Sequence, residues 1–343
     1  RTWVGGDKDG HTGVDEKVML QSLQASRNYL ISVLYLLSED LEQEILRFAR
    51  LSDQAVSLPA ERSYQLLFDF IAGLQEIEVL KEKDGLRILH LKKKYEKFYK
   101  TLPLVLRENL IGTKKIASLF RLFPSLVVPL ELRESSDILR AHQSLVKQPA
   151  IFKMLMTLKK LSSGTNNCGY AESLIISMTE SFKDLKIADS FIHRSLGKKL
   201  AIPVVPLFEQ NKDLIAGPGI MKDWIHFKKL KKQEIMLGYS DSSKQAGVWP
   251  SRLAIHKAMR AFEALKDNTP GLKLTYFHGS GGSVDRGGGS LEDQTAYWPK
   301  SAFDSYKVTI QGEMIQRTLA TPEIFENNLL KIEKIGSRKR RSG

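Results

Sequence analysis

The sequence has very little cysteine and no long hydrophobic run. Cys168 is the only cysteine among the 343 residues, which excludes an internal disulfide framework and fits a reducing compartment. No apolar run approaches the roughly 20 residues of a membrane-spanning helix, and the first residues do not follow the pattern of a signal peptide. We therefore expect a soluble, cytoplasmic protein that is not associated with a membrane, with Cys168 as a buried free thiol.

Aromatic residues are sparse among the basic segments, which argues against nucleic-acid binding. Lys and Arg outnumber Asp and Glu by 52 to 39, and the excess is concentrated at residues 92–94, 228–232 and 338–341. Such runs are usually solvated surface or flexible ends. The net charge of +13 attracts anions in general, so an anionic small substrate is the favoured interpretation.

The composition and length fit one large globular domain. Hydrophobic residues make up 42% of the sequence, which is enough for a sizeable core and excludes a disordered chain. The chain starts at Arg1 within a segment that we interpret as ordered, and it ends soon after the last expected strand. We interpret it as a fragment or a processed product of a longer protein.

The amino-terminal third has the apolar periodicity of helices. Residues 14–50 predict one long amphipathic helix, or two in succession. Residues 60–100 predict a second helical block with a break near Gly85. We expect residues 14–121 to be mainly helical.

The pattern then changes to short apolar runs separated by helix-like stretches. Runs that are apolar on both faces and alternate with helices predict parallel strands in βα units, here at residues 126–132, 173–178, 202–208, 234–239, 272–277 and 306–310. Their spacing favours a barrel over a sandwich. We predict an α/β fold of the (β/α)8 TIM-barrel type, incomplete and with extra α-helices, in which residues 1–343 form one domain and residues 122–320 hold the βα units.

Polar residues follow several of these runs, where barrel enzymes carry their chemistry. They are Arg133, Glu209, Asp241 and His278. Two carboxylates from neighbouring strands suit a hard cation such as Mg²⁺ or Mn²⁺. Equally, each carboxylate could cap the helix that follows it, and the spacing does not separate these alternatives.

A glycine-rich segment runs from His278 to Gly289, with six glycines in twelve positions. Such a backbone can bring its N–H groups close to a phosphate or carboxylate. The segment is neither a P-loop, because no Gly-Lys-Ser/Thr follows, nor a dinucleotide fingerprint. A flexible linker is the alternative, although His278 and Arg286 are unusual in a spacer.

Several stretches resemble those of phosphoenolpyruvate carboxylase of the bacterial and plant type. They occur in the same order and lie at residues 3–10 (Trp-Val-Gly-Gly-Asp-Lys-Asp-Gly), 132–136, 206–209, 237–247, 278–289 and 311–313. The resemblance implies a reaction in which bicarbonate attacks the phosphate of phosphoenolpyruvate, giving carboxyphosphate and an enolate. The enolate then attacks the released CO₂ to form oxaloacetate, and a homotetramer is the usual assembly.

The resemblance also implies roles for the site residues. Glu209 and Asp241 would hold Mg²⁺ or Mn²⁺, which withdraws charge from the phosphate and steadies the enolate oxygen. His278 would take the proton from carboxyphosphate. The substrate anions would be held by Arg133 as a bidentate donor, Lys244 as a point charge, Arg286 with the loop glycines Gly281 and Gly282, and Asp7 and Lys8. For Asp7 and Lys8, structural pairing is an equal alternative.

The sequence departs from the family's pattern in the glycine loop. Ser280 stands where the family has an arginine, so an anion contact worth roughly 1.5–3 kcal/mol is lost. Asp285 replaces a glycine and adds a negative charge beside the anion site. Gln245 and Lys8 are milder changes.

The chain also stops before the family's carboxyl-terminal arginines and lacks an upstream histidine segment, so we expect little or no turnover from this polypeptide alone. A non-catalytic relative that binds a phosphorylated metabolite or a protein is the second hypothesis. A basic scaffold for nucleic acid is the third.

Overall fold

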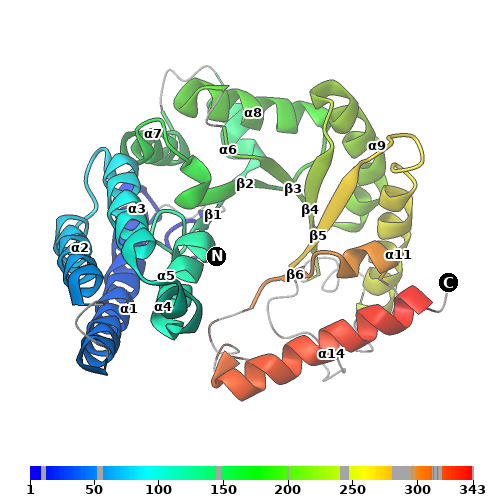
Figure 1. The fold of residues 1–343 in the computed structure, drawn as a ribbon. Helices are drawn as coiled ribbons and strands as arrows, with labels where there is room; N and C mark the ends of the chain where they lie inside the picture. The colour runs from blue at the N-terminus through cyan, green and yellow to red at the C-terminus, as the bar shows by residue number, and fades with distance from the viewer. Residues whose placement is uncertain are drawn as a thin grey trace. The chain divides into compact units, whose positions relative to one another are not determined.

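The computed structural model describes residues 1–8, 13–51, 57–143, 148–198, 201–239, 247–279, 295–296, 298–310, 312, 315 and 319–341. The fold is α/β, with a helical amino-terminal part followed by strands that alternate with helices (Figure 1). In the described residues, no helix is long and apolar enough to cross a bilayer.

The sheet has six strands in the order β1-β2-β3-β4-β5-β6. The strands are β1 (Leu130–Ser135), β2 (Ala171–Ser177), β3 (Val204–Phe208), β4 (Lys232–Gly238), β5 (Lys273–Gly279) and β6 (Lys307–Val308). β3, β4, β5 and β6 pair in parallel, each with the next. All six predicted strands are thus confirmed, with shifts of a few residues at their ends.

Two of these shifts change where a candidate residue lies. Arg133 lies inside β1 and His278 inside β5, so the prediction that they follow their strands was wrong for both. β1 begins four residues later than predicted. Leu126 has a left-handed backbone, with φ of 48°, and the backbone hydrogen bonds to the segment before β2 start where Leu130 N–H donates to Tyr170 C=O.

Helices alternate with the strands along the chain. They are α6 (Ser136–Ala141), α7 (Ala150–Ser162), α8 (Phe182–Leu196), α9 (Asn211–Lys228), α11 (Val248–Glu263) and α14 (Pro322–Arg341), with short 3₁₀ turns η2 (Asn167–Gly169) and η4 (Lys300–Phe303). Helix α14, which contains the basic run 338–341, was not anticipated from the sequence.

The chain divides into two compact units. The first comprises Arg1–Glu134, His142–Leu174 and Asp189–Pro203, and the second comprises Ser135–Ala141, Ile175–Ala188 and Val204–Gly343. The first unit contains the predicted helices, which are α1 (Glu16–Leu51), α2 (Ser57–Glu76), α3 (Asp84–Thr101), α4 (Leu104–Asn109) and α5 (Ile111–Leu122). The predicted break near Gly85 is confirmed, and Gly85 itself lies in the first turn of α3.

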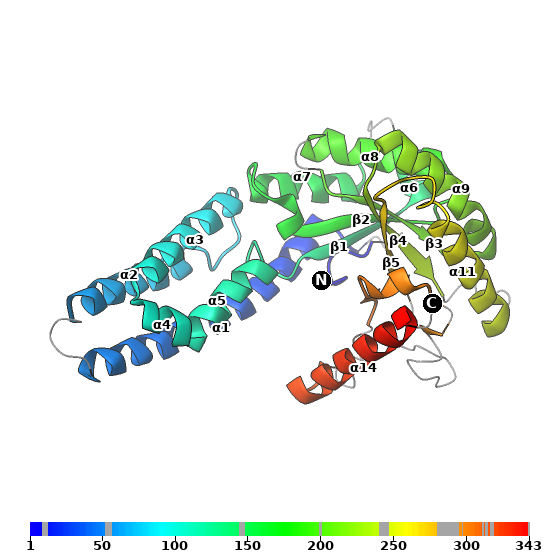
Figure 2. The same ribbon diagram turned by 45° about the vertical axis from the view of Figure 1, so that its right-hand side comes forward.

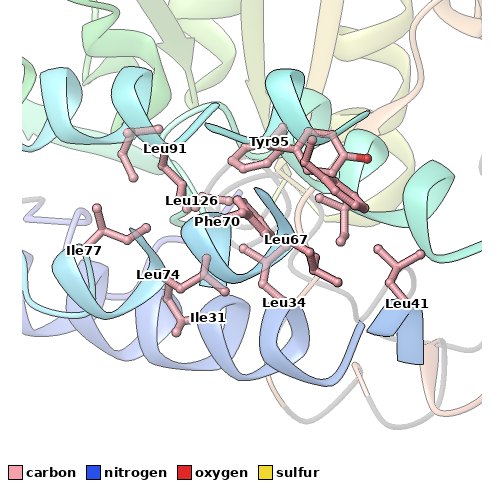
Figure 3. Packing of buried hydrophobic residues seen from close by; sticks show 14 of the residues in the cluster. Ile31, Leu34, Leu41, Leu67, Phe70, Leu74, Ile77, Leu91, Tyr95 and Leu126 are labelled. Atoms are coloured by element: carbon pink, nitrogen blue, oxygen red, sulfur yellow. The ribbon is translucent and has the colours of Figure 1, made fainter. Parts of the chain in front are cut away.

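A single apolar cluster holds these helices together. Helices α2 and α5 lie along α1, and α3 lies along α2 (Figure 2). Side chains such as Leu34 of α1, Phe70 of α2 and Tyr95 of α3 meet in a buried core (Figure 3). Because the apolar face of each helix is covered by its neighbours, removal of this area from water stabilises the bundle at about 25 cal/mol per Å².

Candidate functional site

The second unit brings the ends of three parallel strands to one edge. Phe208 of β3 lies beside Leu237 of β4, which lies beside His278 of β5. The next residue on each strand is therefore at the same level, and these residues are Glu209, Gly238 and Gly279. Carboxyl ends of parallel strands are the usual location of functional sites in α/β folds.

Glu209 is half-buried at the end of β3, and glycine in the next strand gives it room. A Cβ added to Gly238 would lie 2.9 Å from both the Cα and the Cβ of Glu209, so no larger residue fits there. The backbone N–H of Met178 donates to Glu209 Oε1 at 3.0 Å. The hydrogen bond from Met178 thus fixes the Glu209 carboxylate at the carboxyl end of β3, and Gly238 of β4 leaves the space for it.

His278 lies at the same edge but is covered, with only 1% of its surface exposed. Its Nδ1 lies 2.6 Å from the hydroxyl of Tyr239, the residue after β4. Its ring stacks on Trp298, with centroids 3.4 Å apart and planes within 6°. Among the described residues, the buried Nε2 has no hydrogen-bond partner.

The surroundings of His278 determine its charge. Burial disfavours the imidazolium and lowers the pKa of His278 to about 3, so the ring is neutral at neutral pH. The aromatic wall continues beyond Trp298 with Phe303 and Tyr306. Burial also raises the pKa of Tyr306 to about 12, so its hydroxyl stays protonated.

The first unit holds the remaining described candidates, Asp7, Lys8 and Arg133. Residues 2–8 run alongside β1 in parallel, with bridges from Thr2 to Leu130 and from Asp7 to Arg133. Arg133 Nε lies 2.6 Å from Asp7 Oδ1, and its guanidinium stacks over Trp3 at 5.5 Å. Lys8 Nζ lies 3.6 Å from the buried Glu134. Asp7 and Lys8 thus each lie beside an oppositely charged side chain, and their role toward a substrate stays a prediction.

Five candidates lie outside the described residues. These are Asp241, Lys244, Gly281, Gly282 and Arg286. The pairing of Glu209 with Asp241 therefore stays a prediction. Within the described parts of the chain, no group of three or more His, Cys, Asp or Glu side chains is suited to hold a metal ion.

Sequence reasoning missed two residues of this site, Tyr239 and Trp298. Tyr239 belongs to the strand-end segment that contains Asp241, and its position immediately after β4 was the available signal. For Trp298 the spacing offered none, because the segment that carries it follows the glycine-rich loop and meets His278 only in three dimensions.

These features define an α/β protein with a candidate site at the carboxyl ends of parallel strands. The family model for phosphoenolpyruvate carboxylase matches residues 127–334, which is more than half of the chain. The chain therefore belongs to the phosphoenolpyruvate carboxylase family, and the resemblance noted from its motifs is confirmed.

Individual relatives match a similar stretch. A phosphoenolpyruvate carboxylase of Edwardsiella ictaluri is 38% identical over 167 residues, which cover 47% of this chain and 19% of the relative. Phosphoenolpyruvate carboxylase 3 of Arabidopsis thaliana is 37% identical over 180 residues, which cover 51% of this chain and 18% of the relative. Each match thus spans about a fifth of the relative's length.

Proposed function

We propose that this chain carries out the carboxylation of phosphoenolpyruvate by bicarbonate, which yields oxaloacetate and phosphate and feeds the tricarboxylic acid cycle. The observation that supports it most strongly is a neutral histidine and a carboxylate, His278 and Glu209, at the ends of β5 and β3, the two parallel strands on either side of β4, in a member of this family. We further propose that the six strands are part of a (β/α)8 barrel, and that the protein is cytoplasmic and a homo-oligomer.

The donor types at this edge suit a hard divalent cation. Glu209 and Asp241 would hold Mg²⁺ or Mn²⁺, since carboxylate oxygens are the ligands these ions prefer. When bound, the cation would stabilise negative charge that develops on a substrate oxygen.

The cationic residues would bind the substrate's phosphate and carboxylate. Arg133 is available in a defined orientation, because Asp7 and the ring of Trp3 hold its guanidinium. A phosphate would compete with Asp7 for the same donors. Lys244, Arg286 and the backbone of Gly281 and Gly282 would complete the anion site, with Lys8 adding positive charge.

His278 would accept the proton of carboxyphosphate. The ring is neutral and so has a lone pair to accept it, but its low pKa opposes protonation. A bound anion next to the ring would favour the imidazolium and raise that pKa. In this proposal, substrate binding itself raises the pKa of His278 and so makes the ring a better proton acceptor.

The second candidate function is binding of a phosphorylated metabolite, or of a protein, without turnover. Two observations favour it. Ser280 removes a guanidinium from the glycine loop, and Trp298 covers the ring of His278. The indole restricts the access of a substrate proton to the ring, whereas the missing guanidinium removes only one of several anion contacts, so turnover would be impaired more than binding.

Oxaloacetate formation coupled to NADH oxidation tests the first function directly. We expect a rate that depends on phosphoenolpyruvate, bicarbonate and Mg²⁺ or Mn²⁺, and that is lost in Asp241→Asn. Asp267→Asn is the matched control, because Asp267 is an exposed acid near the end of α11. An unchanged rate in Asp241→Asn would remove the assigned metal role.

Calorimetric titration with phosphoenolpyruvate, with and without Mn²⁺, separates the two functions. Heat of binding without any oxaloacetate would support the binding function. Absence of both binding and turnover would exclude both.

A further inference from the structure

The two nitrogens of the His278 ring have different surroundings. Nδ1 lies 2.6 Å from the Tyr239 hydroxyl, within hydrogen-bond distance. Nε2 is fully buried and has no hydrogen-bond partner among the described residues. A neutral imidazole carries one proton, so it must place that proton on one of these two unlike positions.

The cost of each tautomer follows from this asymmetry. If Nε2 carries the proton, a buried N–H donor has no acceptor in the part of the chain that the structure describes, and orphaned buried N–H groups are rare in proteins because they are costly. If Nδ1 carries it, the proton is donated to the Tyr239 oxygen. The atom left without a partner is then a nitrogen lone pair, and buried acceptors are left unsatisfied more often than donors.

The ring is held in this orientation from two further directions. Trp298 stacks on one face, with planes within 6°. The carbonyl of His278 accepts a hydrogen bond from Thr309 N–H at 2.9 Å, which fixes the strand beneath the ring. Rotation of the imidazole about Cβ–Cγ would disrupt the stack and move Nδ1 away from the Tyr239 hydroxyl, so the ring keeps this orientation.

We propose that Tyr239 is a positioning residue that holds His278 in the Nδ1–H tautomer and leaves the Nε2 lone pair as the proton acceptor. The acceptor role rests on the proposed function, whereas the tautomer is a property of the folded chain without substrate. Tyr239 acts through His278 and needs no contact with the substrate.

Nitrogen-15 NMR of histidine-labelled protein at neutral pH tests the tautomer. The ring signals of His278 are identified by their loss in His278→Gln. We expect Nδ1 to carry the proton in the wild type and Nε2 to be unprotonated. In Tyr239→Phe the tautomer ratio should move toward Nε2–H by about fivefold, which is what loss of one hydrogen bond of about 1 kcal/mol produces.

Tyr306→Phe is the matched control, because it removes a hydroxyl from the same aromatic cluster at a residue that contacts Trp298. It should leave the His278 signals unchanged. The wild-type spectrum is informative even if Tyr239→Phe fails to fold: an Nε2–H tautomer in the wild type overturns the proposal. So does a Tyr239→Phe spectrum identical to the wild type.

The activity assay is read separately. If the chain turns over, Tyr239→Phe should lower kcat by up to about fivefold, the factor by which the tautomer ratio shifts, with KM for phosphoenolpyruvate unchanged because substrate contacts are intact. An inactive chain that still shows the expected tautomer shift would count against the carboxylase function alone. An active chain with the wrong tautomer would count against the role of Tyr239 alone.

Discussion

At the scale of single residues, His278 shows how packing changes the chemistry of a side chain. An exposed histidine changes charge near pH 6.5, whereas this one is buried beneath Trp298 and has a pKa of about 3. The indole covers one face of the ring.

Removal of that cover should restore ordinary titration. In Trp298→Ala we expect the pKa of His278 to rise from about 3 toward 6.5, because water then stabilises the imidazolium. Chemical shifts of the His278 ring across a pH series measure it. Trp298→Phe retains an aromatic cover and should keep the pKa low; a low pKa in Trp298→Ala would show that Trp298 is not the cause.

The same depressed pKa makes stability depend on pH. Between the folded pKa of about 3 and an unfolded value of about 6.5, the unfolded state binds the proton and the folded state does not, so stability falls as pH falls through this window. From pH 7 to pH 5 the loss from this group is about 2 kcal/mol.

Urea unfolding at these two pH values checks the sign. Wild type should lose more stability on acidification than His278→Gln, which has no titrating ring. Equal losses in the two proteins would mean that His278 is as easily protonated in the folded state as in the unfolded chain.

At the scale of secondary-structure elements, helix α9 contains the sequence Gly217-Pro218-Gly219, which is unfavourable for a helix interior. The two glycines differ in surroundings. A Cβ at Gly217 would lie 3.0 Å from Phe262 and 3.3 Å from Phe208, whereas a Cβ at Gly219 would meet nothing within 4 Å. Close packing on the sheet accounts for Gly217 and leaves Gly219 unexplained.

We therefore expect opposite effects from the same substitution two residues apart. Gly219→Ala should stabilise the protein by about 0.5–1 kcal/mol, because alanine restricts the unfolded chain and favours the helix. Gly217→Ala should destabilise it through overpacking by about 1–3 kcal/mol. Thermal unfolding followed by circular dichroism measures both, and a destabilising Gly219→Ala would contradict this account of α9.

At the scale of the molecule, a buried ion pair connects distant segments of the first unit. Arg27 and Asp84 are fully buried and bonded bidentately, with Nη2 and Oδ2 at 2.7 Å. The remaining N–H groups of Arg27 donate to the carbonyls of Ile77, Ser125 and Leu126. The hydroxyl of Tyr170 donates to Asp84 at 2.7 Å. One guanidinium thus joins α1 to three other parts of the chain.

Breaking the Arg27–Asp84 pair should lower the free energy of unfolding more than removing the hydrogen bond from Tyr170. Asp84→Asn leaves the arginine charge buried without its counter-charge, and we expect a loss of about 3–5 kcal/mol in the free energy of unfolding. Tyr170→Phe removes a single hydrogen bond and should cost about 1 kcal/mol. Urea titrations of the two variants measure both losses in the free energy of unfolding. Similar losses would show that the unpaired charge of Arg27 is not the cause of the destabilisation.

The sequence determined the local elements and the family. The helical period of residues 14–50 corresponds to α1, and the six apolar runs correspond to β1 to β6. Each element buries one or both faces, and the spacing of apolar residues along the sequence shows which residues lie on a buried face. The position of Glu209 directly after β3 was predicted correctly for the same reason. Both ends of β1 and β5 were misplaced, since hydrogen bonds to neighbouring strands decide where a strand stops.

Only the tertiary structure determined which side chains these residues contact and how burial changes their pKa values. Tyr239 is 39 positions from His278, and no spacing rule relates the two. The same holds for the Trp298 stack and for the Arg27–Asp84 pair. Desolvation and hydrogen bonding depend on which side chains meet in space, and for contacts between distant segments that is fixed by the packing of whole elements.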